Sequence, residues 1–168
     1  MFRDKKLKTH FVRYFFYLTL VSTILSCTKD EEALSNETDY HIWSGPEIEF
    51  TKAAGSDPQL KVNQDSITKN VSITRGNSGG EIYNIFLETE ASKGASPMGT
   101  EWAIGEVSNI SSLTFQSFRN AVGSPKQVVG KSLVLHLIEE DQYISVEFKS
   151  WGQQHSGSFS YVRTTRTE

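Results

Sequence analysis

Cysteine is almost absent from this sequence, with one residue, Cys27, in a chain of 168. A single cysteine excludes any disulfide within the chain, so a folded domain must rely on its hydrophobic core alone. Long apolar runs are also scarce. Residues 14–25 form an apolar stretch that is shorter than the roughly 20 residues of a typical membrane-spanning helix.

Catalytic and metal-binding motifs are missing as well. The sequence contains no G-x-S-x-G nucleophile elbow and no H-E-x-x-H motif. The histidines after the signal region, His41, His136 and His155, have no metal-ligand spacing. His136 lies in an apolar run, which predicts a hydrogen-bonded histidine of the core or sheet edge. No cofactor motif occurs, and we expect no cofactor.

The first 26 residues have the order of a signal peptide. Five basic residues and one acid precede the apolar stretch, which ends in Ile24-Leu25-Ser26-Cys27. This ending resembles the lipobox of bacterial lipoproteins. The resemblance implies cleavage before Cys27 and lipid chains on that cysteine, which would anchor the protein stably in a membrane. An ordinary secretory signal or an uncleaved anchor is the alternative.

Residues 27–39 predict an acidic, flexible tether, because such segments bury too little apolar surface to fold. Within them, Lys29-Asp30-Glu31-Glu32 resembles the surface-export signal of Bacteroidetes lipoproteins, which implies the exterior face of the outer membrane. A plain solvated tether is the alternative. Without residues 1–26 the chain has 12 Lys and Arg against 19 Asp and Glu. This balance argues against nucleic acid as a partner and against electrostatic docking to anionic lipid.

Residues 40–168 predict one domain, and the stretch 133–151 predicts its central hairpin. Residues 133–138 form an almost continuous apolar run, which is typical of a strand buried on both faces. After the polar turn 139–142, apolar and polar residues alternate with the period of a strand. A third strand, 157–163, places Phe159 and Tyr161 on one face. The predicted core residues of the hairpin are Leu135, Leu137, Ile144, Val146 and Phe148.

Further strand patterns complete an all-β domain. Gly- and Pro-rich turns separate them, and residues 119–131 predict a long surface connection. About eight strands without an amphipathic helix indicate an antiparallel two-sheet β-sandwich, with a jelly roll as one form. The remaining strand patterns cover residues 47–52, 67–75, 81–88, 101–107 and 112–118.

Five runs of the sequence, taken together, form a recognisable pattern: 64–68, 71–76, 96–97 with 100–105, 133–151 and 159–161. They resemble a module of secreted and cell-surface bacterial proteins for which no activity is established. The similarity covers nearly all of residues 46–165 and supports a cell-surface location and a compact fold. Such modules are glycine-rich before the last strand, whereas this chain has Gln153-Gln154-His155-Ser156 there, which argues against a ligand site lined by backbone groups at this place.

Aromatic residues are the candidates for glycan binding. Trp43, Trp102 and Trp151, with Tyr143 and Tyr161, could stack on sugar rings, although aromatics in β-domains usually form the core. We expect Trp151, at a strand end, to be the exposed one. If loops 94–102, 139–142 and 151–157 converge, they bring together a ligand site of three residues, Trp102, Asp141 and Trp151.

Two shorter patterns suggest other sites. Glu139, Glu140 and Asp141 carry carboxylates of the kind that bind calcium, but a solvated acidic turn is the simpler interpretation, since no EF-hand spacing accompanies them. Asp65-Ser66-Ile67 resembles a Bacteroidetes O-glycosylation site at Ser66, and a turn capped by Asp65 is the alternative.

Together these patterns predict a cell-surface lipoprotein whose β-domain is a non-catalytic binding or accessory module. Its ligand would be a glycan or an envelope protein. The missing nucleophile elbow and metal spacing favour binding over the alternative, a hydrolase with an unrecognised active site.

Overall fold

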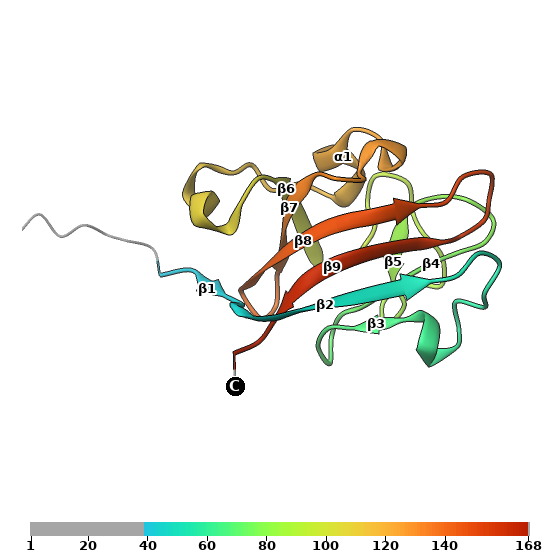
Figure 1. Ribbon diagram of the computed structural model, residues 1–168, viewed down its shortest axis with the longest axis horizontal. Coiled ribbons are helices and arrows are strands. Elements are labelled where there is room, and N and C mark those ends of the chain that lie inside the picture. The colour runs from blue at the N-terminus through green and yellow to red at the C-terminus, as the bar shows by residue number, and fades with distance from the viewer. Residues whose placement is uncertain (1–38, 168) are drawn as a thin grey trace, which may run out of the picture. The chain divides into compact units, whose positions relative to one another are not determined.

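Two β-sheets make up residues 39–167, which are the residues described by the computed structural model (Figure 1). The larger sheet has the order β2-β9-β8-β7-β6, with antiparallel neighbours, and β1 adds a short parallel pairing to β8. Its strands are β1 (His41–Ile42), β2 (Gly45–Lys52), β6 (Thr100–Ile104), β7 (Ser132–Leu137), β8 (Gln142–Trp151) and β9 (Phe159–Thr165).

The smaller sheet contains β3 (Asp65–Ser66), β4 (Ser72–Arg75) and β5 (Ile82–Asn84), all antiparallel. The predicted all-β sandwich is therefore confirmed. Strands β6 to β9 are sequential neighbours with β2 at the edge, so the larger sheet is a meander rather than part of a jelly roll. Residues 37–168 form one compact unit. The predicted signal peptide, lipidation site and export signal lie outside the described residues.

The predicted hairpin forms the centre of the larger sheet. Leu135 pairs with Ile144 across β7 and β8, and all five predicted core side chains are buried. They pack with side chains of the smaller sheet, such as Ile73 and Ile82, in the main hydrophobic core. Val134, on the opposite face of β7, packs in a second cluster, as expected for a strand that is buried on both faces.

The predicted strand 112–118 is wrong. Only Gln116 forms an isolated bridge, to Trp102, between η2 (Val107–Ser112) and α1 (Phe118–Val122). The alternation arises because Leu113 and Phe115 cover the second cluster while Phe118 turns into the main core. Among the described residues no helix is long and apolar enough to cross a bilayer. The remaining helical turns are η1 (Lys61–Asn63) and η3 (Pro125–Gln127).

Two other segments differ from expectation. The connection 119–131 is not simply a surface loop, since Val122 and Val128 are buried in the main core. Strands β4 and β5 are shorter than the patterns 67–75 and 81–88 predicted. Asn84 ends β5, because its side-chain oxygen accepts hydrogen bonds from the backbone N–H groups of Ser72 and Phe86.

Candidate functional site

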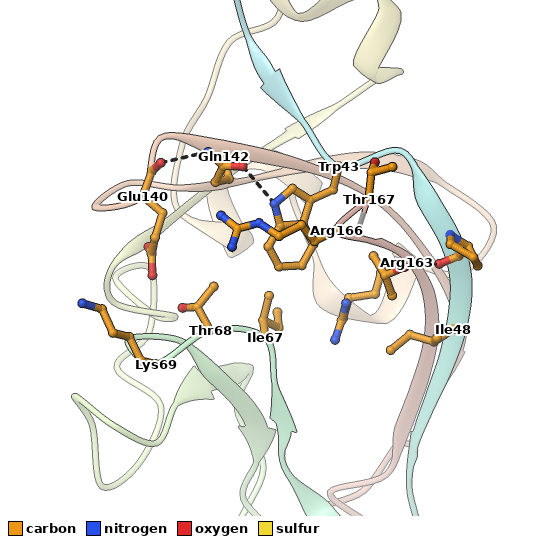
Figure 2. Close-up of a pocket in the computed structure, with 12 residues that line it drawn as sticks. Trp43, Ile48, Ile67, Thr68, Lys69, Glu140, Gln142, Arg163, Arg166 and Thr167 are labelled. Atoms are coloured by element: carbon orange, nitrogen blue, oxygen red, sulfur yellow. Dashed lines mark hydrogen bonds between the residues drawn. The ribbon is translucent and has the colours of Figure 1, made fainter.

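A groove of about 1210 Å³ opens at the end of the sandwich where β2 begins, β9 ends and β7 turns into β8 (Figure 2). Its volume is slightly above the range of roughly 300–1,000 Å³ that is common for small-molecule sites. We call it the Trp43 groove. Trp43, Ile48 and Ile67 give it apolar walls, while Lys69 and Glu140 stand at its polar side.

Trp43 is held in place by the larger sheet. Its backbone N–H donates to the Tyr143 carbonyl (2.8 Å), and its indole Nε1 donates to Gln142 Oε1 (3.0 Å). Gly45 then allows β2 to pass close to the end of β9, since a Cβ at this position would lie 2.8 Å from the Thr165 carbonyl oxygen. The tryptophan ring is therefore a fixed wall of the groove.

An ion pair between the sheets forms a second wall. Arg163 donates to both carboxylate oxygens of Asp65, from Nε (2.7 Å) and Nη2 (2.8 Å), and the Tyr161 hydroxyl donates to the same carboxylate (2.6 Å). Burial alone lowers the pKa of Arg163, but the hydrogen bonds and charge of Asp65 outweigh it and raise that pKa. Because Asp65 neutralises Arg163, this guanidinium adds little net charge to the groove.

Three other charged side chains line the groove, namely Lys69, Glu140 and Arg166. Lys69 and Arg166 are exposed, and neither forms an ion pair within residues 39–167. Glu140 accepts a hydrogen bond from Asn70 Nδ2 at Oε1 (3.0 Å), whereas its Oε2 is buried without a partner among the described residues. Figure 2 shows Glu140 and Lys69 on one side of the groove and Arg166 beside Trp43. The groove thus offers charged donors around apolar walls, and its acceptor is Glu140 Oε1, which can accept a second hydrogen bond.

The predicted aromatic platform is wrong, because both of its tryptophans belong to the core. Trp102 is 0% exposed and Trp151 is 8% exposed. Each packs against Phe118 and Phe148, and the Arg75 guanidinium covers the Trp151 ring at 3.9 Å. Neither ring has a free face on which a sugar could stack.

The predicted convergence of three loops is also wrong. Loops 94–102 and 139–142 do adjoin, since the Ile138 N–H donates to the Gly99 carbonyl (3.2 Å). Loop 151–157 lies at the other end of β8, ten residues and about 30 Å from Asp141 at the usual rise of a strand. Asp141 instead lies 3.0 Å from His136 Nε2 at the β7–β8 turn.

His136 lies on β7, an inner strand of the larger sheet, and is hydrogen-bonded to Asp141. Its ring stacks on Tyr143 with centroids 4.4 Å apart, and Nδ1 lies 3.6 Å from Glu101 Oε2. Within residues 39–167 no three His, Asp or Glu side chains are grouped so that they could hold a metal ion. The acids of the 139–141 turn diverge, with Glu140 directed to Asn70 and Asp141 to His136.

Ser66 is exposed on β3, with its Oγ 3.1 Å from Ser72 Oγ. Asp65 does not cap a turn, since its carboxylate is occupied by Arg163 and Tyr161. Glycosylation of Ser66 stays a prediction.

Sequence reasoning missed Lys69 and Arg166 and considered Glu140 only for calcium. Trp43 is among the aromatic candidates, and this is the one local signal that points to the groove. The partners of Trp43 lie 99 or more residues away in the sequence, so the pattern around it could not indicate them. Comparisons with protein-family models, with curated proteins and with solved structures found no match.

Proposed function

We propose that this chain is a lipid-anchored cell-surface protein whose β-sandwich binds a glycan in the Trp43 groove. The supporting observation is the mixture of groups around one cavity. Lys69 and Arg166 only donate hydrogen bonds, whereas the carboxylate of Glu140 accepts them. A ligand that fits this arrangement must carry acceptors for Lys69 and Arg166 and a donor for Glu140.

Carbohydrate hydroxyls meet that requirement, because each hydroxyl is both a donor and an acceptor. The apolar walls complement the C–H faces of a sugar ring. Ile48 contributes most here, since its side chain lies on the groove and is 41% exposed. The two cations outnumber the one unpaired carboxylate, which favours a glycan that also carries negative charge over a neutral one.

The proposed location at the cell surface rests on the sequence of residues 1–32. Lipid chains on Cys27 would hold the domain at the membrane, and the export signal Lys29–Glu32 would place it on the exterior face. In that position extracellular or envelope glycans would have direct access to the groove of the folded domain. An envelope protein is the other ligand class, and a hydrolase with an unrecognised site is the other function.

A glycan array tests the proposal. Residues 37–168 form a compact unit with its own core, so they can be produced as a soluble domain. We expect this domain to retain acidic glycans, and Glu140→Gln, which keeps the size of the side chain, to retain less. Thermal melting of both proteins verifies that the variant is folded.

Three outcomes would contradict the proposal. One is an array without bound glycan. Another is capture of a single envelope protein in place of a glycan, and the third is turnover of glycoside or ester substrates by the domain, which would indicate the hydrolase.

A further inference from the structure

Arg75 is a buried cation that has no carboxylate partner in the part of the chain that the structure describes. Its side chain is 4% exposed and lies at the end of the sandwich opposite to the Trp43 groove, near the end of β8. Nε donates to the Gly80 carbonyl (3.2 Å), and Nη1 donates to the carbonyls of Gly152 (3.0 Å) and Ser158 (2.8 Å). No ion pair of Arg75 occurs within residues 39–167.

The remaining nitrogen, Nη2, has no acceptor among the described residues. It is not one of their fully buried side-chain atoms that lack a partner, so it keeps some accessible surface, and Arg75 lines a pocket. Burial lowers the pKa of Arg75 to about 10, so the group is still cationic at neutral pH. The hydrogen bonds of Nε and Nη1 hold the loops at Gly80, Gly152 and Ser158 in place. This structural role does not account for Nη2, which is left to bind a ligand.

The pocket around Arg75 has a volume of about 560 Å³ and no acidic residue in its lining. We call it the Arg75 pocket. Arg119, Lys126 and His155 also line it, and of these Arg119 is paired with Glu81 (3.0 Å). Ser78 and Ser124 also line the pocket, and each carries a hydroxyl that can donate.

A second buried cation increases the positive potential at this end. Lys52 is 0% exposed and donates to the carbonyls of Ser56 (2.8 Å) and Gly157 (3.3 Å) and to Asn77 Oδ1 (3.1 Å). Burial, and secondly the charge of Arg75, lower the pKa of Lys52, while the charge of Asp57 raises it. Asp57 thus offsets part of the positive charge at Lys52, but two buried cations close enough to affect each other still favour a further anion beside Arg75.

We propose that the Arg75 pocket binds an oxyanion group, a phosphate or a sulfate ester carried by a small organic ligand. Arg75 Nη2 and Lys126 Nζ supply the charged donors, and the serine hydroxyls supply neutral ones. The volume exceeds that of one oxyanion and leaves room for an attached organic group. This site is separate from the Trp43 groove, and either site can exist without the other.

Nuclear magnetic resonance titration of the 37–168 domain tests the proposal. Inorganic phosphate and inorganic sulfate are the probes, and chloride at equal ionic strength is the control. We expect saturable amide shifts confined to residues 75–80, 124–126 and 151–157, with the tighter of the two anions identifying the ester. Shifts with neither anion, or shifts of the same size with chloride, would overturn the proposal.

Charge-reversal variants make the test specific. Lys126→Glu, an exposed position that should not affect folding, is expected to weaken binding of the anion at least tenfold. Lys69→Glu makes the same change of charge at the opposite end and is expected to leave the affinity within about twofold. Equal losses in both variants would mean a general charge effect and would contradict a site at Arg75.

Discussion

Asp65 and Arg163 join the two sheets through a buried bidentate ion pair, with donor–acceptor distances of 2.7 and 2.8 Å. Asp65 belongs to β3 of the smaller sheet, and Arg163 to β9 of the larger one. The Tyr161 hydroxyl donates to the same carboxylate. The carboxylate therefore satisfies two donor groups of β9, and the pair fixes the distance between the sheets beside the groove.

Removing the negative charge of this pair should destabilise the domain strongly. Asp65→Asn leaves Arg163 buried without its counter-charge, which costs about 3–5 kcal/mol in comparable pairs. Urea denaturation of the 37–168 domain measures the change. The control is Glu147→Gln, which breaks the exposed pair with Lys149 and should cost about 0–1 kcal/mol. Equal losses in the two variants would show that the buried pair has no special role.

The buried hydroxyl of Tyr161 should make the domain less stable at alkaline pH. Burial, and then the charge of Asp65, raise the pKa of Tyr161 well above its ordinary value of 10.0. An unfolded tyrosine ionises near pH 10 while the folded one stays neutral, so this contribution is complete below pH 10 and is lost as the pH rises toward the folded pKa. We expect the free energy of unfolding of wild type to fall more steeply above pH 10 than that of Tyr161→Phe. Parallel curves would contradict the assignment.

Truncation of Phe148 should cost about 3–5 kcal/mol, because its ring is fully buried against Trp102, Phe118 and Tyr161. The exposed Val62 provides the control, since Val62→Ala removes apolar atoms that are 77% exposed and should change stability little. Chemical denaturation measures both. A cost near zero for Phe148→Ala would mean that β8 faces the other way.

The hairpin of β7 and β8 could be predicted because its signals are local. Alternation in 144–148 reflects one buried face of β8, and the apolar run 133–138 reflects burial of β7 on both faces. The segment 112–118 also alternates, but its apolar side chains pack on two different clusters without forming a strand. Local patterns therefore indicated which residues are buried, but in 112–118 they did not indicate the correct element.

The groove could not be predicted, because its residues come from distant segments. Trp43, Lys69, Glu140 and Arg166 lie on four separate parts of the chain, and only the sandwich brings them to one cavity. The prediction that Trp151 is an exposed aromatic platform was wrong for a related reason. A strand end appears exposed in the sequence, yet Arg75 of the smaller sheet covers this ring.

Lipidation of Cys27 is a prediction from the sequence alone. Cells that express the full chain should incorporate a fatty acid analogue into wild type and not into Cys27→Ala. Protease treatment of intact cells then tests surface exposure, and replacement of Lys29–Glu32 by alanines should reduce digestion. Incorporation of the fatty acid analogue into Cys27→Ala would contradict lipidation of Cys27. Complete protection of the wild-type protein from protease would contradict its predicted exposure at the cell surface.

The central claim is that the Trp43 groove is the binding site. The most direct measurement is calorimetric titration of the 37–168 domain with the glycan that the array retains best, in wild type, Glu140→Gln, Arg166→Ala and the distant Lys126→Glu. Our account predicts at least tenfold weaker binding in each groove variant, equivalent to about 1.4 kcal/mol, with Lys126→Glu close to wild type. Unchanged affinity in both folded groove variants would place the glycan elsewhere and contradict the account.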